Sequence, residues 1–196
     1  MRVQIHIYNS NDALLDDLLA SKYISELETM SFDKYKNLET KKEKVVSSIF
    51  KNKYIGTYHL NEFGKPVSDS KFFNISHSHG LVAFVMDDYP IGVDIERIRP
   101  AKEDLIEYIS SEDEKKYIHD DESFFEIWTN KEALVKCIGT GIKVKPRDIV
   151  GLPVNGPRTY NGVTFYNKTV KYLGSVITVS RQINEDFDIE VIKEII

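Results

Sequence analysis

Two acidic segments contain the residue types and spacing best suited to metal-dependent chemistry. In the segment 91–96, IGVDIE, apolar and polar residues alternate as in a strand, so Gly92, Asp94 and Glu96 are expected on one face and the apolar residues in a core. Two carboxylates this close raise each other's pKa, and a bound divalent cation removes that conflict. Gly92 is expected to leave open space where a ligand can approach. The alternative interpretation is a solvated strand edge with two surface acids.

A helical segment further along the chain supplies a third carboxylate. Trp128, Glu132 and Lys136 recur at every fourth position, so they share one stripe of a helix. Taken alone, Glu132 and Lys136 are typical of a surface ion pair. Together with the two acids of the strand, Glu132 completes a carboxylate set of the kind that binds Mg²⁺, which is completed by water and substrate phosphates. Lys136 would then meet a phosphate as a point charge.

A third segment, FFNISHSHG at 72–80, is polar where a strand is expected. His77 and His79 would share a face of that strand, as in a transition-metal pair, but no third soft ligand accompanies them and zinc is disfavoured. Ser76, His77 and Ser78 can instead donate hydrogen bonds to a phosphate. The alternative interpretation is a polar strand end that binds nothing.

The elements that must position these residues follow from the periodicity of the chain. Alternating runs predict strands at 3–8, 72–76, 81–86, 91–96, 163–166, 175–180 and 188–192. Helical spacing predicts helices at 13–23, 32–54, 105–109, 112–118 and 124–138, the second of them rich in lysine. A hairpin loop at 87–90 is expected to join two strands, and Gly139, Thr140 and Gly141 to end the last helix. The sequence therefore predicts an α+β fold with an N-terminal half, 1–98, and a C-terminal half, 99–196, in one continuous unit.

Composition narrows the class of protein. The 196 residues are 41% hydrophobic and 29% charged, which is typical of a globular domain, and the net charge of −5 makes nucleic acid a poor default partner. No apolar run is long enough to cross a membrane. The sequence has one cysteine, Cys137, so an intramolecular disulfide is excluded. The N-terminal residues also lack the basic and then apolar pattern of a signal peptide. Together these two observations predict a cytoplasmic location.

The three segments occur in an order that resembles a known family. FNISHS, then GVDIE, then WTNKEALVKCIGTGI is similar to the 4'-phosphopantetheinyl transferases of the surfactin-synthetase-activating (Sfp) type. The resemblance covers most of the chain, from the lysine-rich helix through the C-terminal half. It implies transfer of phosphopantetheine from coenzyme A to a serine of an acyl or peptidyl carrier protein, with release of 3',5'-adenosine bisphosphate. It also implies two similar halves about a pseudo-twofold axis, each a small antiparallel sheet on a long helix, with coenzyme A in the cleft between them.

The resemblance also implies roles at the reacting phosphates. Asp94, Glu96 and Glu132 would bind magnesium, and Lys136 would hold the pyrophosphate. The carrier serine would attack the β-phosphorus of coenzyme A while magnesium offsets the charge of the leaving group. Glu132, or a metal-bound water beside it, would take the serine proton. Glu114 best matches a further acid that follows the middle linker of the family.

Other residues would contact coenzyme A away from the reacting bond. Ser76 and His77 match residues that contact its phosphates, with His77 at the 3'-phosphate, and Lys65 matches the loop on the adenine side. Lys131 would lie close to the pyrophosphate. Lys44 stands where the family has an arginine, a change that keeps the charge but loses the bidentate fork.

Two other functions would use the same residues. A magnesium-dependent phosphohydrolase acting on a nucleotide or pyrophosphate would employ the same acids with water as the nucleophile, and a non-catalytic module would only hold coenzyme A or a carrier protein.

Carrier docking is expected at Lys115 and Lys116, with Phe124 and Phe125 supplying apolar area. The length of two halves predicts a monomer, because one chain can then form the whole cleft.

Overall fold

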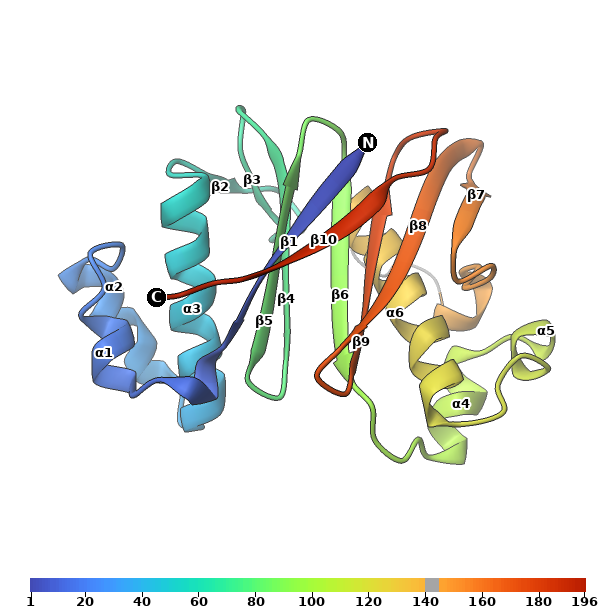
Figure 1. Ribbon diagram of the computed structural model, residues 1–196, viewed down its shortest axis with the longest axis horizontal. Coiled ribbons are helices and arrows are strands. Elements are labelled where there is room, and N and C mark those ends of the chain that lie inside the picture. The colour runs from blue at the N-terminus through green and yellow to red at the C-terminus, as the bar shows by residue number, and fades with distance from the viewer. Residues whose placement is uncertain (140–144) are drawn as a thin grey trace.

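Two four-stranded sheets form the centre of the computed structural model, which describes residues 1–139 and 145–196 (Figure 1). The first sheet consists, in spatial order, of β10 (Asp188–Lys193), β1 (Arg2–Asn9), β5 (Leu81–Asp87) and β4 (Phe72–Ser78). The second consists of β6 (Ile91–Arg97), β9 (Ser175–Arg181), β8 (Val163–Tyr172) and β7 (Gly156–Tyr160). A short hairpin of β2 (His59–Leu60) and β3 (Pro66–Val67) stands apart from both.

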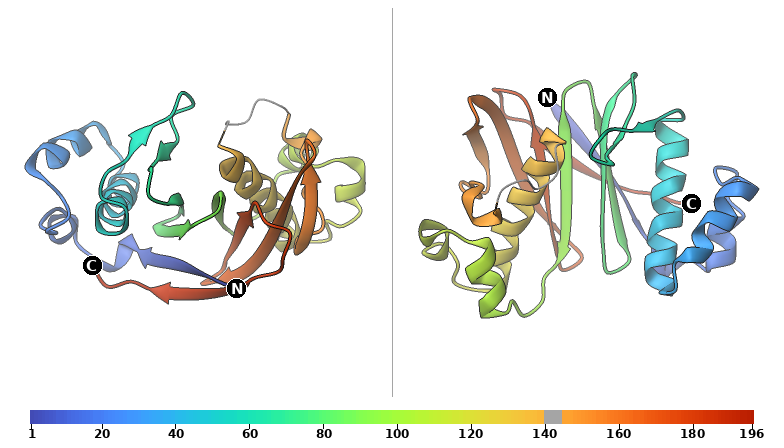
Figure 2. Two further views of the ribbon diagram at one scale, coloured as in Figure 1. Left: turned by 90° about the horizontal axis from the view of Figure 1, so that it is seen from above. Right: turned by 180° about the vertical axis from the view of Figure 1, so that it is seen from behind.

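Each sheet carries one long helix. The helix α3 (Leu38–Tyr54) packs on the first sheet and α6 (Asp121–Ile138) on the second. Seen from behind, α3 and α6 flank the strands β4 and β6, while β1 and β10 cross on the opposite side (Figure 2). The shorter helices are α1 (Leu15–Leu19) and α2 (Glu26–Ser31) beside α3, and α4 (Glu103–Ile109) and α5 (Glu112–Lys115) beside α6. Within the described residues, no helix is long and apolar enough to cross a bilayer.

Local sequence sets the ends of the two long helices. The Asn37 side chain accepts a hydrogen bond from the Thr40 amide and caps α3. Asp120 and Ser123 form a capping box at the start of α6. At the end of α6, Gly139 has a φ of 81°, a left-handed conformation that glycine adopts without strain. This confirms Gly139 as the helix stop, and Thr140 and Gly141 lie outside the described residues.

The two sheets share one apolar core. Alternate residues of β6, namely Ile91, Val93 and Ile95, are buried there as the alternation predicts. They meet apolar side chains of β1, β5 and β9, so the core does not stop at the boundary between the sheets. Separate clusters fill the spaces between α3 and the first sheet and between α6 and the second.

Several expectations differ from the structure. Residues 87–90 do not close a β-hairpin, because β5 pairs with β1 and β4 whereas β6 pairs with β9. The connection instead carries the chain from one sheet to the other. The first sheet is not wholly antiparallel either, since β10 returns from the second sheet and pairs in parallel with β1. The helix expected at 32–54 begins only at Leu38, after a 3₁₀ turn at Phe32–Lys34.

Candidate active site

The strands β4 and β6 are the facing edges of the two sheets, and side chains join them. The Val93 amide donates to Asn74 Oδ1 at 3.0 Å, and the Arg97 amide donates to Ser78 Oγ at 3.2 Å. Between them, the Ile95 amide donates to Ser76 Oγ at 3.4 Å. Alternate polar residues of β4 therefore take the place of the main-chain partners that β6 would have inside a sheet. This seam brings the FNISHS and GVDIE segments together.

Asp94 is the buried centre of the candidate site. Its Oδ1 accepts hydrogen bonds from Ser76 Oγ at 2.9 Å and from Lys136 Nζ at 2.6 Å. Its Oδ2 is buried and has no hydrogen-bond partner among the described residues. A buried carboxylate oxygen is rarely left unpaired, so this atom is directed at a place where a ligand is needed.

Two further carboxylates line the same pocket, which has a volume of about 430 Å³. Glu96 Oε2 accepts from Arg99 Nη1 at 3.0 Å and from Ser78 Oγ at 3.2 Å. Burial raises the pKa of Glu132, and the nearby carboxylate of Asp94 raises it further. The pocket therefore holds more negative charge than its own cations neutralise.

The donor set of this pocket suits a hard divalent cation. Asp94, Glu96 and Glu132 offer carboxylate oxygens, which are the ligands that Mg²⁺ prefers. A cation bound here would give Asp94 Oδ2 the partner that it lacks, and it would lower the raised pKa of Glu132. In residues 1–139 and 145–196, no three such side chains are already gathered as a metal-binding cluster. The ammonium of Lys136 instead lies against Asp94 and supplies the counter-charge.

Gly92 acts differently from the expectation of open space on this face. A Cβ atom at Gly92 would lie 2.2 Å from the Ala133 carbonyl oxygen and 2.3 Å from the Cys137 amide nitrogen. The expectation was wrong because α6 packs directly on β6 at this point. Only glycine permits that approach, and the approach places Glu132 and Lys136 of α6 beside the acids of β6.

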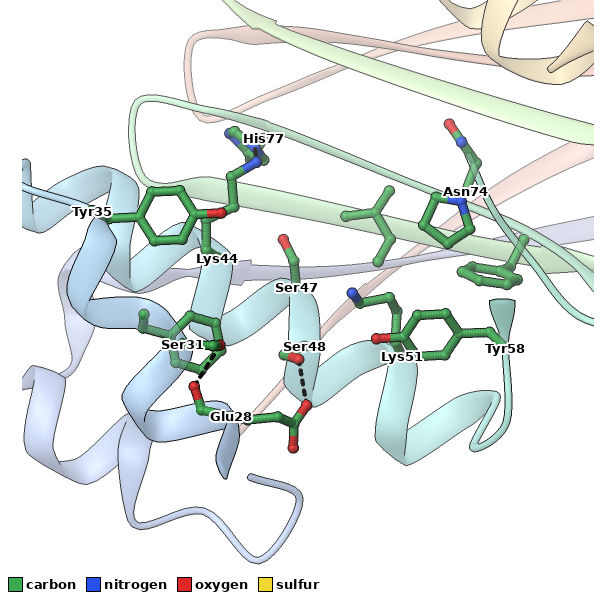
Figure 3. Close-up of a pocket in the computed structure, with 14 residues that line it drawn as sticks. Glu28, Ser31, Tyr35, Lys44, Ser47, Ser48, Lys51, Tyr58, Asn74 and His77 are labelled. Carbon is green, nitrogen blue, oxygen red and sulfur yellow. Dashed lines mark hydrogen bonds between the residues drawn. The ribbon is translucent and has the colours of Figure 1, made fainter. Parts of the chain in front are cut away.

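A second pocket, of about 370 Å³, adjoins the first along β4 (Figure 3). Ile75 and His77 line both pockets. Lys44 Nζ lies 2.9 Å from His77 Nε2, and Figure 3 places both at the same edge of the pocket. The other ring nitrogen of His77, Nδ1, lies 2.9 Å from Glu43 Oε2. The structure thus brings Lys44 and His77 together, 33 residues apart in the chain.

Lys65 closes a third pocket, of about 270 Å³, that shares Glu132 and Lys136 with the first. Its Nζ donates to the carbonyl oxygens of Lys136, at 2.5 Å, and Cys137, at 3.5 Å. Burial lowers the pKa of Lys65. Lys65 therefore caps the C-terminal end of α6, where a cation also meets the negative end of the helix dipole.

Two of the expected site residues lie away from these pockets. Lys131 is buried, and its Nζ donates to Glu114 Oε2 at 2.6 Å and to the Ile109 carbonyl at 2.6 Å. Glu114 Oε1 also accepts from the Gly151 amide at 2.6 Å. The pair joins α6 to the short helices and to the loop before β7. The structure does not bring either residue to Asp94.

Comparison with known proteins identifies the segment that holds most of these acids. The family model of the 4'-phosphopantetheinyl transferase superfamily matches residues 90–176, which include Asp94, Glu96, Glu132 and Lys136. Over this segment the chain is similar to that superfamily. The 4'-phosphopantetheinyl transferase gsp of Aneurinibacillus migulanus is 29% identical over an alignment of 157 residues, and the alignment covers 71% of this chain and 66% of that protein.

Two shorter matches are to other phosphopantetheinyl transferases. The transferase psf-1 of Bacillus pumilus is 39% identical over an alignment of 88 residues that covers 40% of this chain and 38% of that protein. The transferase Sfp of Bacillus subtilis (strain 168) is 31% identical over an alignment of 96 residues that covers 44% of this chain and 43% of that protein. The chain thus spans less than two thirds of the length of each of these relatives.

The surface expected to dock a carrier protein is not available in the form predicted. Phe124 and Phe125 have exposed fractions of 0% and 1%, because they belong to the core between α6 and the second sheet. Lys115 pairs with Glu107 and Glu112, so much of its charge is already compensated within the chain. The expectation of apolar docking area from the two phenylalanines was therefore wrong.

The sequence reasoning missed two residues that shape the candidate site. Asn74 was part of the FNISHS motif, but its role in joining β4 to β6 depends on strands that are not neighbours in one sheet. Glu43 was hidden among the lysines of α3. Its position directly before Lys44 is a usable signal only once the fold places His77 opposite that helix.

Proposed function

We propose that the protein transfers the 4'-phosphopantetheine group of coenzyme A to a serine of an apo acyl or peptidyl carrier protein, with release of 3',5'-adenosine bisphosphate. The observation that carries the proposal is the pocket around Asp94, where three carboxylates and Lys136 meet within the segment matched to the superfamily. The relatives reported above are all named 4'-phosphopantetheinyl transferases, which supports the same reaction.

In this proposal Asp94, Glu96 and Glu132 hold magnesium. When bound there, magnesium supplies positive charge for the pyrophosphate of coenzyme A and for the charge that develops on the leaving bisphosphate. Lys136 contributes the second cation. Its ammonium, which is bonded to Asp94 in the free protein, is released to a phosphate oxygen once Asp94 has another partner.

Glu132 is the proton acceptor in the proposed reaction. Its carboxylate can accept the proton of a serine hydroxyl brought into the pocket that it lines with Asp94, Glu96 and Lys136. The serine hydroxyl of the carrier would lose its proton as its oxygen attacks the β-phosphorus. Positioning and charge compensation then account for most of the rate.

The nucleotide end of coenzyme A is proposed to occupy the second pocket. His77 and Lys44 stand at its edge, next to the first pocket, and would contact the 3'-phosphate. Ser76 lines the first pocket, between Ile75 and His77 in the chain, and would contact another phosphate of coenzyme A. Lys65 would support the adenine side by fixing the loop after β2 to the end of α6. Lys131 would act indirectly, through the position of α6.

The arrangement of the elements supports the wider parts of the proposal. One long helix on each four-stranded sheet, α3 and α6, is compatible with two similar halves about a pseudo-twofold axis that act as one monomeric unit. The halves 1–98 and 99–196 exchange strands, since β6 pairs in the second sheet and β10 in the first. The first and third pockets take residues from both halves, so one chain would be sufficient for the site. The single cysteine of the sequence agrees with a cytoplasmic location.

A mass measurement tests the reaction directly. The protein is incubated with coenzyme A, magnesium and several apo carrier proteins, and the carriers are weighed by mass spectrometry. A gain of one phosphopantetheine group, abolished by EDTA and by Asp94→Asn, is expected. Asp88→Asn is the matched control, because Asp88 is an exposed acid whose loss should leave transfer unchanged.

Other outcomes assign the protein to other classes. Hydrolysis of coenzyme A without any carrier would identify a phosphohydrolase. Binding of coenzyme A with no gain on any carrier would identify a binding module. Transfer that persists at full rate in Asp94→Asn would contradict the assignment of the metal-binding acids.

A further inference from the structure

Glu43 is a buried acid in contact with His77 of the second pocket, and the proposed reaction gives it no role. It lies on α3, directly before Lys44, with an exposed fraction of 5%. Its Oε1 accepts a hydrogen bond from the Gly80 amide at 2.8 Å, and its Oε2 lies 2.9 Å from His77 Nδ1. Burial alone would raise its pKa, but the hydrogen bonds from His77 and Gly80 bring the pKa of Glu43 below its ordinary value. Glu43 is therefore a carboxylate at neutral pH.

The two neighbours of His77 determine where its ring proton lies. A carboxylate only accepts hydrogen bonds, so the proton is on Nδ1, which faces Glu43. An ammonium only donates, so Nε2 presents its lone pair to Lys44 at 2.9 Å. The ring is thus held as the Nδ1–H tautomer, with Nε2 at the edge of the second pocket.

We infer that Glu43 is a positioning residue that holds the His77 ring so that Nε2 and the Lys44 ammonium together face the terminal phosphate monoester of the nucleotide. This inference rests on the proposed function, which puts the 3'-phosphate at His77. Lys44 donates directly to a phosphate oxygen. One proton lies between Nε2 and a second phosphate oxygen, and it is brought by the phosphate monoanion, whose last proton is lost only near pH 6.

The negative charge of Glu43 also has an electrostatic part in this arrangement. When the shared proton resides on Nε2, the imidazole becomes a cation whose other N–H still points at a carboxylate. A charge-assisted hydrogen bond of this kind is about twice as strong as a neutral one. Without Glu43 the imidazole ring of His77 would be free to turn. A hydrogen-bond donor at position 43 would favour the Nε2–H tautomer of His77.

The test uses Glu43→Gln, which keeps the volume of the side chain. Its amide oxygen can still accept from the Gly80 amide, but its amide nitrogen then donates toward His77 Nδ1. Glu39→Gln is the matched control, because Glu39 lies exposed on the same helix and loses the same charge. Long-range ¹H–¹⁵N NMR, with His77 assigned through His77→Asn, reports the tautomer. Calorimetry compares the binding of adenosine 3',5'-bisphosphate with that of adenosine 5'-monophosphate.

We expect the Nδ1–H tautomer in the wild type and in Glu39→Gln, and its loss in Glu43→Gln. The preference for the bisphosphate over the monophosphate should fall about tenfold in Glu43→Gln and stay unchanged in the control. A wild-type ring in the Nε2–H tautomer overturns the inference even if the variant does not fold. A folded variant with unchanged preference overturns it as well, and leaves Glu43 as a structural tie to Gly80.

The outcomes for the inference and for the reaction are separable. Should the wild type modify no carrier and yet lose its bisphosphate preference in Glu43→Gln, the transferase proposal fails and the role of Glu43 stands. If the wild type modifies carriers but does not prefer the bisphosphate, the role of Glu43 fails and the transferase proposal stands.

Discussion

At the residue scale, the carboxylates of the site outnumber the cations that neutralise them. Asp94 has one oxygen bonded to Ser76 and Lys136 and one oxygen with no partner in the part of the chain that the structure describes. Burial and the negative charge of Asp94 also raise the pKa of Glu132. Lys136 is the residue on which this balance depends in the absence of a metal ion.

Lys136→Met should therefore destabilise the metal-free protein. Loss of the ammonium leaves the buried Asp94 carboxylate with less compensation, and we expect a cost of about 1–3 kcal/mol in the free energy of unfolding. Added Mg²⁺ should restore more stability to the variant than to the wild type. Urea unfolding with EDTA and with millimolar Mg²⁺ measures both effects. Lys168→Met is the matched control, since Lys168 is similarly exposed but pairs with the exposed Asp186; an equal loss in both variants would contradict the prediction.

Gly92→Ala tests the close approach of α6 to β6. The added methyl group would overlap main-chain atoms of Ala133 and Cys137, which cannot move without shifting the helix. We expect a loss of about 1–3 kcal/mol in unfolding free energy, together with a lower rate of the proposed transfer reaction as Glu132 and Lys136 move. Gly64→Ala has open space around it and a φ of 78°, so it reports backbone strain alone. A Gly92 variant no less stable than the Gly64 variant would refute the packing argument.

At the scale of elements, the most informative unit is the seam between β4 and β6. Neither strand completes the other's main-chain ladder, and three side chains of β4 accept the amides of β6 instead. The seam fixes the two sheets to each other along the floor of the pockets. It also explains why polar residues alternate in a strand whose polar face is buried.

Asn74→Ala should weaken this seam. The Val93 amide would lose its acceptor while it stays buried, which costs about 1–3 kcal/mol. Native-state hydrogen exchange should show faster exchange at the Val93 amide, and urea unfolding should show the loss of stability. Ser70→Ala, in an exposed turn before β4, serves as the control. Unchanged protection of Val93 in Asn74→Ala would count against the role of this side chain.

The elements were predictable where periodicity was strong. The alternation of IGVDIE placed Ile91, Val93 and Ile95 in the core, and the strands at 3–8, 81–86 and 175–180 were found close to their observed bounds. The pairing was not predictable, because nothing local indicates that the chain changes sheets between Asp87 and Ile91. The strand β7 was missed, since Gly156 and Pro157 are typical of a turn.

The candidate site was also predictable only where local spacing in the sequence determines which residues share a face. The carboxylates and Lys136 could be grouped from spacing, because a strand period and a helix period each fix a face. The partners of Lys131, Lys65 and Gly92 could not, since each depends on a segment distant in sequence. Buried lysines in particular look like surface lysines until their acceptors are known.

At the scale of the whole molecule, Glu194 fixes the end of the strand β10 to the first half. Burial alone would raise the pKa of Glu194, but hydrogen bonds from Lys53, Tyr54 and His6 bring it below its ordinary value. Lys53 Nζ and Tyr54 Oη donate to its carboxylate at 2.7 and 2.5 Å. The contact joins α3, β1 and the segment after β10.

The lowered pKa of Glu194 makes the free energy of unfolding depend on pH. Because the folded state prefers the carboxylate, its stabilisation is present above the unfolded pKa of about 4.3 and is lost as the pH falls through the lower folded value. Glu194→Gln should be about 1–3 kcal/mol less stable than the wild type at pH 7. The difference should shrink below about pH 4, as measured by urea unfolding across pH. A difference that does not change with pH would refute the charged role, and Glu190→Gln, on exposed β10 surface, is the control.

The parallel pairing of β1 with β10 has a consequence for the time course of folding. Gln4 and Glu190 touch across this pair although 186 residues separate them, so the two strands can meet only after a very long loop has closed. Contacts of such sequence separation form late and slow the search for the native state. Until then the free edge of β1 is open to strands of other molecules. Refolding at high protein concentration should therefore favour aggregates, and dilution should restore the yield of folded protein.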